Sequence, residues 1–238
     1  MQEEVAKHTK KIYQAVTRPG HTIFEKIKEI AVEIFIIVFA VTLSIWLHSW
    51  SDHRHEQKEV NEFLVGLKDD LQQDIALLAA NKNIAIQLDS NFNALIALNE
   101  SHAIDTAANK TLSHYLYFSL VVTHPGIGRY EGFKSSGKIG MIENAGLKQK
   151  ILVYYEQTMP DLASGENYVN SLQSKILDAE IDKDKIPLKD FVRSYKVRAL
   201  LNLCTQNLDG GIKDYENTIQ QAKNIIAMIG LDDNHFPR

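Results

Sequence analysis

The sequence predicts an all-α protein, with an N-terminal transmembrane helix continuing into a long stalk helix and then an extracytoplasmic helical bundle. Three observations predict this. Residues 30–47 contain one charged side chain, Glu33. Downstream apolar residues recur at the three- and four-residue spacing of a helix, and no segment alternates convincingly as a strand does. The predicted divisions are a cytoplasmic tail with an amphipathic helix (1–27), the transmembrane helix (28–50), the stalk helix (51–100) and the extracytoplasmic helical domain (101–238).

The apolar stretch 30–47 is long enough to cross a bilayer. At 1.5 Å per residue it spans about 27 Å, close to the thickness of the hydrocarbon layer. Trp46 and Trp50 stand at one end, where indole rings favour the headgroup level. The alternatives are a buried core helix and a cleaved signal peptide; no small-residue cleavage motif follows Leu47. We therefore expect contact with the lipid bilayer.

Glu33 is the one charged residue of this stretch. An acid inside a membrane is costly and rarely faces lipid. Glu33 either reaches the interface and pairs with nearby lysines, or faces other helices in an oligomer. Glu33, Trp46 and Trp50 are therefore the predicted membrane and oligomer interface.

Positive charges set the predicted orientation. Six precede the apolar stretch, and three follow it within a similar distance: Lys7, Lys10, Lys11, Arg18, Lys26 and Lys28, then Arg54, Lys58 and Lys68. Cytoplasmic flanks carry the excess of lysine and arginine. The N-terminus is predicted to be cytoplasmic and the large domain, in a bacterium, to lie in the periplasm beyond the inner membrane.

The stalk helix carries one apolar stripe, with charged residues off it. Its members follow helical spacing: Val60, Leu64, Leu67, Leu71, Ile75 and Leu78. Fewer than four clean heptads are present, so the stripe favours packing in a domain core over a coiled coil. Leu64, Leu67, Leu71, Ile75 and Leu78 are the predicted stalk packing residues.

The remaining helices are predicted from caps and breakers. They are expected at 110–122, at 129–136 with its end at Gly137, from Asn144 to 158 with its end before Pro160, and at 161–182, 188–208 and 212–229. Asn144 can cap a helix, and proline cannot continue one. Pro187 suits a helix start, and Gly210-Gly211 and Gly230 suit helix ends.

No catalytic signature is convincing, so the chain is predicted to be no enzyme and to need no cofactor. Gly132–Lys138 matches G-x-x-x-x-G-K, but a phosphate loop needs Ser or Thr next, and Ile139 stands there. Cys204, the single cysteine, lies in an apolar run and is predicted to be a small buried hydrophobe. The net charge of −4 does not favour nucleic acid as a partner.

A weak metal-site candidate lies just beyond the apolar stretch. His48, Asp52 and His55 fall at i, i+4 and i+7 on one helix face. Imidazole and carboxylate groups bind zinc and similar ions. Histidine at a headgroup boundary without metal is the favoured interpretation, with metal binding or pH sensing as the alternative.

The stretch from Glu33 through Trp46 to Trp50, the segment Arg129–Asn144 and the pair Tyr154-Tyr155 resemble an uncharacterised family. These are single-pass membrane proteins with a domain of unknown function, common in Bacteroidota. The resemblance covers residues 28–158, and implies architecture and no function. Val32 departs from the family, which tends to place glycine before the glutamate, so close helix packing at this point is in doubt.

These observations predict a membrane-anchored oligomeric scaffold or an accessory subunit of a membrane complex. Its expected partners are further copies of the chain or other membrane-protein subunits. An oligomeric ion or proton channel is the alternative, with a pore lined by Glu33, Thr42, Ser44 and His48. An extracytoplasmic sensor or binding domain is a further alternative.

Overall fold

The computed structural model describes residue 10 and residues 23–100, 119–181 and 188–232. Every element in these ranges is helical and none is a strand, which confirms the all-α prediction. The predicted tail helix, apart from residue 10, and residues 110–118 of the helix expected at 110–122 lie outside the described residues.

The longest element, α2, runs without interruption over Ile23–Glu100. The chain forms two compact units, Met1–Glu59 and Val60–Arg238. The division falls inside α2, within the range predicted as the stalk helix. Val60 is the first residue of α2 with a buried side chain among those described, so the helix joins a core from this point.

The first unit holds a part of α2 that is long and apolar enough to cross a membrane, and none of it is buried. Its large side chains are open to the surroundings; Phe35 is 68% exposed and Trp46 is 60% exposed. A helix apolar on every side is stable only in an apolar environment. This helix is consistent with a single-pass membrane protein, and it is not the core helix that was the alternative.

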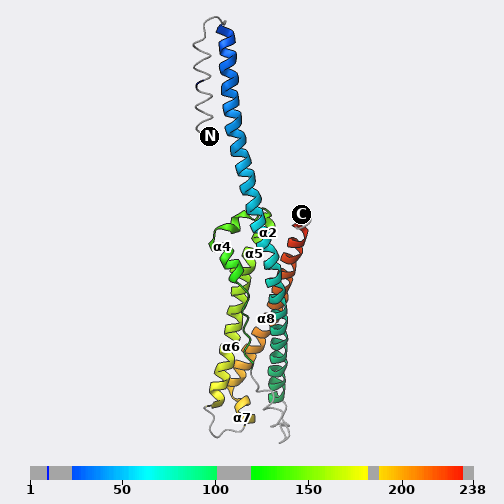
Figure 1. The fold of residues 1–238 in the computed structure, drawn as a ribbon. Coiled ribbons are helices and arrows are strands. Elements are labelled where there is room, and N and C mark those ends of the chain that lie inside the picture. The colour runs from blue at the N-terminus through cyan, green and yellow to red at the C-terminus, as the bar shows by residue number, and fades with distance from the viewer. Residues whose placement is uncertain (1–9, 11–22, 101–118, 182–187, 233–238) are drawn as a thin grey trace. The chain divides into compact units, whose positions relative to one another are not determined.

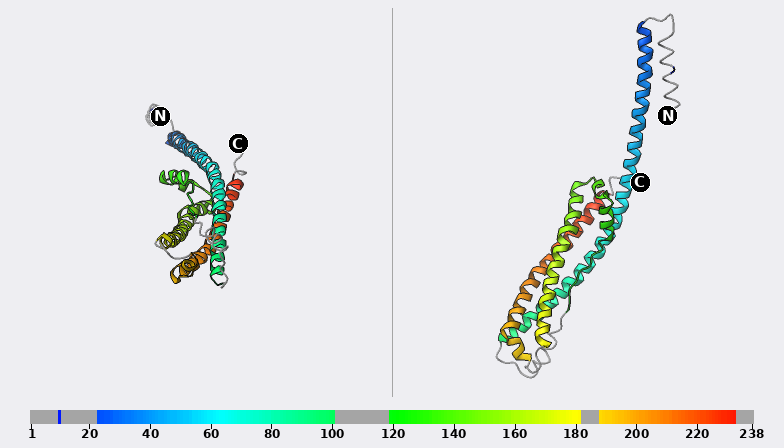
Figure 2. Two further views of the ribbon diagram at one scale, coloured as in Figure 1. Left: turned by 90° about the horizontal axis from the view of Figure 1, so that it is seen from below. Right: turned by 90° about the vertical axis from the view of Figure 1, so that its left-hand side faces the viewer.

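The second unit is built from three long helical rods that run side by side (Figures 1 and 2). The first rod is α2 from Val60 onward. The second joins α5 (Ala145–Val153), the π-helix η2 (Tyr154–Thr158) and α6 (Met159–Ile181), and the third is α8 (Tyr195–Asp232). The described part of the unit also contains three short elements: α4 (Gly128–Ser135), η1 (Lys138–Met141) and α7 (Leu188–Arg193).

The predicted stripe of α2 packs into the core of this unit. Leu64, Leu67, Leu71 and Leu78 are buried, and Ile75 is half-buried against the same core. The core has two parts. One part joins α2 to α6, α7 and α8. The other joins α2 to α4, α5, η2 and the end of α8.

Two local predictions are confirmed by the backbone. Gly137 has a left-handed φ of 77° directly after the C-cap of α4, a conformation that glycine adopts without steric cost. The Asn144 side chain accepts a hydrogen bond from the Leu147 amide at 3.0 Å and so caps α5.

Pro160 does not end the second rod, contrary to prediction. Proline has no N–H to donate within a helix. The rod meets it with a turn of π-helix, in which the Met159 amide donates to the Tyr154 carbonyl five residues earlier. The wider turn lets the helix pass the proline, and α6 continues to Ile181.

Gly210-Gly211 does not end a helix either. Helix α8 passes through both glycines, because buried residues on either side belong to one core-facing stripe: Leu201, Leu208, Tyr215 and Ile225. Packing of that stripe outweighs a helix propensity cost of about 1 kcal/mol per glycine. The break falls instead at Ser194, whose hydroxyl accepts a bond from the Val197 amide at 3.4 Å at the start of α8.

Candidate functional site

Residues 119–127, here called the strap, form neither helix nor strand, whereas the sequence predicts a helix that reaches Val122. Along the strap Val121 and Thr123 are buried, while Leu120 and Val122 are exposed. The Asn170 side chain of α6 pairs with the Val121 backbone in both directions. It accepts from the Val121 N–H at 3.2 Å and donates to the Val121 carbonyl at 2.7 Å. This amide therefore satisfies both backbone groups of Val121, which have no partner in a helix or strand.

Side chains of α2 and α6 hold the rest of the strap. The Thr123 N–H donates to Glu166 at 2.8 Å. From α2, Asn81 donates to the Val122 carbonyl at 3.2 Å and to the Thr123 hydroxyl at 2.8 Å. The Gly126 N–H donates to Asp74 at 3.1 Å. The strap is therefore fixed through its backbone.

Glu166 is the most buried acid of α6, with 7% of its surface exposed. Besides the Thr123 N–H, its carboxyl group accepts hydrogen bonds from the Thr123 and Tyr215 hydroxyls. Burial, and then the bond to Glu166, raise the pKa of Tyr215. Tyr215 is therefore a neutral donor at physiological pH, and the three bonds compensate the burial of the acid.

A cavity of about 190 Å³ opens beside Glu166. Its walls are mainly apolar, with Val121 from the strap, Leu162 and Val169 from α6 and Leu208 from α8. The other lining residues are Ala85, Gly165, Glu166, Gln206, Asn207, Gly210, Gly211, Asp214 and Tyr215. An apolar cavity with a few convergent polar groups is the usual form of a small-molecule site.

A second buried acid, Asp74 of α2, lies beside the π-helix. It accepts the Gly126 N–H and, at 3.4 Å, the Tyr154 hydroxyl. Burial raises the pKa of Asp74, against the opposing effect of these bonds. The neighbouring Tyr155 hydroxyl is buried without a hydrogen-bond partner among the described residues.

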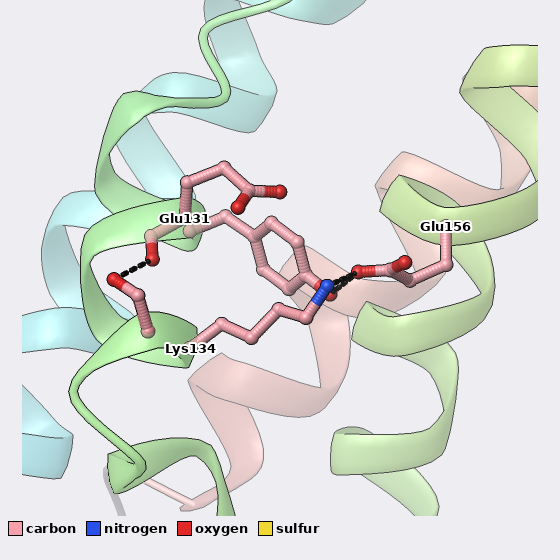
Figure 3. A network of polar contacts seen from close by, with 5 residues as sticks. Glu131, Lys134 and Glu156 are labelled. Atoms are coloured by element: carbon pink, nitrogen blue, oxygen red, sulfur yellow. Dashed lines mark hydrogen bonds and ion pairs between the residues drawn. The ribbon is translucent and has the colours of Figure 1, made fainter.

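A polar network joins α4 to the π-helix (Figure 3). The Glu156 carboxylate accepts from the Lys134 ammonium and the Tyr130 hydroxyl. The hydrogen bond from Lys134 has the largest effect in lowering the pKa of Glu156. The same bond raises the pKa of Lys134. The Ser135 hydroxyl returns to the Glu131 carbonyl at 2.6 Å. Because its members bond one another, this network holds α4 in place and offers no activated nucleophile.

The segment that matches G-x-x-x-x-G-K belongs to the same part of the unit. Its first glycine lies inside α4, Gly137 makes the left-handed turn and Lys138 begins η1. The glycines therefore form a helix end and a turn.

The three weak metal candidates do not gather in one site within the chain. His48 contacts Asp52 at 3.4 Å, whereas His55 contacts Glu59 at 3.8 Å. Among the described residues no group of three metal-ligating side chains occurs. Of the other predicted interface residues, Glu33 is half-exposed. The Arg54 guanidinium lies over the Trp50 ring, 4.9 Å from the ring centroid.

The residues that hold the strap are not among those predicted from the sequence. The sequence does contain an indication of them, because polar residues occupy positions that continue the helical spacing of the apolar stripes. Asp74 and Asn81 are seven residues apart in α2, and Glu166, Asn170 and Gln173 are spaced four and three apart in α6. Buried polar groups need partners, so such positions predict a polar element between two helices.

Comparison of the chain with protein-family models, curated proteins and solved structures found no match. The resemblance of residues 28–158 to the uncharacterised membrane family therefore stays a prediction. The molecule is defined by its own features as an all-α protein with one candidate membrane-spanning helix and a helical domain that contains a small cavity.

Proposed function

We propose that the protein is a membrane-anchored, non-catalytic scaffold or accessory subunit. It forms oligomers or joins other membrane proteins through the apolar part of α2. The N-terminus lies in the cytoplasm and the helical domain in the periplasm, with the inner membrane between them. The supporting observation is the apolar window of α2, none of which is buried within the chain.

The polar side chains that bond one another or the backbone within the helical domain support a structural role. Asn81, Asn170 and Asp74 are bonded to the strap. The Arg129–Asp70 pair at 2.8 Å and the Lys134–Glu156 pair join α4 to its neighbours. These groups are engaged in holding the fold, so none stands ready as an acid, base or nucleophile.

Crosslinking and native mass measurement in mild detergent test the proposal. The full chain is expected to migrate as an oligomer or with copurifying membrane subunits. If Glu33 faces neighbouring helices, Glu33→Gln weakens the complex, whereas Asp69→Asn, an exposed acid on α2, leaves it intact. A strict monomer without a copurifying partner would defeat the proposal.

The ion pathway remains the rival proposal. The Thr42 hydroxyl, one of its expected pore-lining groups, donates to the Val38 carbonyl at 2.7 Å. Such a bond within the helix leaves fewer groups to replace the hydration of an ion. Liposome flux by the parent protein and by Glu33→Gln decides, and lack of flux in the parent protein removes this rival.

A further inference from the structure

The cavity beside Glu166 is large enough for a small organic molecule. Its volume is about 190 Å³. An apolar protein cavity of about 150 Å³ accommodates benzene, and a water molecule occupies about 30 Å³ of liquid. The space therefore fits a body the size of one aromatic ring with a short polar substituent.

Three glycines line this space. Gly165 in α6 and Gly210 and Gly211 in α8 line the cavity. A Cβ atom at any of them would meet nothing within 4 Å, and none has a positive φ. Neither helix packing nor backbone geometry requires glycine here, although each costs about 1 kcal/mol in helix propensity relative to alanine. Each of these positions at the edge of the cavity therefore has room for a methyl group.

The polar groups of the cavity favour a positive charge. Glu166 and Asp214 line it, and none of its lining residues is Lys or Arg. Glu166 makes no ion pair with a described residue. Its Oε2 atom accepts one hydrogen bond, from the Thr123 N–H, while Oε1 accepts two. Since a carboxylate offers about four acceptor positions, Oε2 retains one for a ligand.

The lysine of α8 nearest the cavity has a carboxylate partner of its own. Lys213, one position before Asp214, is bound by Asp209 at 2.7 Å. Lys213 therefore pairs with Asp209 at the surface, and the buried carboxyl of Glu166 has no cationic partner among the described residues.

We propose that the cavity binds a small organic cation with an apolar body. Its ammonium group donates to Glu166, and its body lies against Val121, Leu162 and Leu208. The helical domain would then act as a ligand-binding domain. This role goes beyond anchoring and assembly, and it holds whether or not the chain forms oligomers.

Benzylamine and benzyl alcohol are matched probes, since they share a ring and differ in charge. Equilibrium dialysis uses the full chain in nanodiscs, with empty nanodiscs as the blank. Benzylamine is expected to bind saturably and at least tenfold more tightly than benzyl alcohol. Glu166→Gln is expected to weaken benzylamine binding at least tenfold, whereas Glu156→Gln, outside the cavity, leaves it unchanged.

A variant that fills the cavity gives a second, independent test. Gly165→Ala, Gly210→Ala and Gly211→Ala together add three methyl groups in open space and favour both helices. This variant is expected to fold, to unfold at a higher temperature and to bind benzylamine at least fivefold more weakly. Gly132→Ala in α4 is the control and keeps the parent affinity.

Three results would overturn the proposal. They are no saturable binding of benzylamine, equal binding of the alcohol and the amine, and an unchanged affinity in the cavity-filled variant. If Glu166→Gln fails to fold, the comparison of the two probes and the cavity-filled variant decide the matter.

Discussion

At the residue scale, this protein places polar side chains at positions where a helical core normally carries apolar ones. Asp74, Asn81, Glu166 and Gln173 are all buried. A buried polar group without a partner costs about 1–3 kcal/mol. The extended strap supplies most of the needed partners, so the strap and these side chains stabilise each other.

Asn170→Ala should destabilise the helical domain. The change removes both hydrogen bonds to Val121 and leaves its N–H and carbonyl without partners. We expect the free energy of unfolding to fall by about 1–3 kcal/mol, measured by denaturant unfolding of the full chain in a fixed detergent. Asn167→Ala, exposed on the same helix, should change it by less than about 0.5 kcal/mol. Equal effects of the two changes would show that Asn170 does not hold the strap.

Asp74→Asn should make the protein more stable at neutral pH. Burial raises the pKa of Asp74 above 3.8, so the ionised form opposes folding. In the parent protein, ionised Asp74 lowers the free energy of unfolding at every pH above the raised pKa. This loss disappears as the pH falls toward 3.8, because the folded protein binds the proton of Asp74 more tightly than the unfolded protein does. The variant's advantage, about 1.4 kcal/mol per unit of pKa shift, should shrink over the same range. Denaturant unfolding from pH 4 to 8 measures it, and a gap constant with pH would contradict it.

At the element scale, glycine and proline affect helices according to their surroundings. Gly137 ends α4 through a left-handed conformation, whereas Gly210 and Gly211 lie inside α8. Gly66 shows a third role. A Cβ atom there would lie 2.3 Å from the guanidinium of Arg129, so the glycine makes room for that side chain beside α2. Arg129 then reaches Asp70 at 2.8 Å.

Two glycine-to-alanine changes should therefore have different effects. Gly132→Ala meets no atom within 4 Å and should raise the free energy of unfolding by about 1 kcal/mol. Gly66→Ala should gain less or lose stability, because Arg129 must move away from Asp70. In an Arg129→Ala background the gain should return, which a double-mutant cycle measures. An equal gain for both glycines in the parent protein would refute this role for Gly66.

At the scale of the whole molecule, the exposed apolar part of α2 and the helical domain serve different environments. The first unit offers apolar side chains on every face, while the second buries its own stripe of α2 in a core. One helix can suit both environments because its apolar side chains lie on every face before Val60 and along one buried stripe after it.

Cysteine labelling should establish the orientation of the chain. Cys204 is fully buried, and burial raises its pKa to about 12, so it should stay unreactive in the folded protein. An impermeant maleimide added to intact spheroplasts should label Gln73→Cys, at an exposed position of α2. It should label Gln14→Cys only after permeabilisation. The reverse pattern would place the helical domain in the cytoplasm.

Features that depend on neighbouring residues can be predicted from the sequence alone. The apolar stretch around Ile37, the helical stripe of Leu64 to Leu78, the turn at Gly137 and the cap at Asn144 can all be predicted from local spacing. Each follows from the backbone or hydropathy preferences of a few consecutive residues. Their prediction required no knowledge of the core.

The tertiary structure decided the features that join residues far apart in the chain. Thr123 meets Glu166 across 43 residues, and Asp74 meets Gly126 across 52. Helix α8 passes Gly210-Gly211 because distant helices pack against both of its halves. The strap and the cavity exist only through such contacts. Packing and hydrogen bonds between distant residues contribute about a few kcal/mol. They outweigh the local helix propensities that predicted a helix end at Gly210-Gly211 and a helix through Val122.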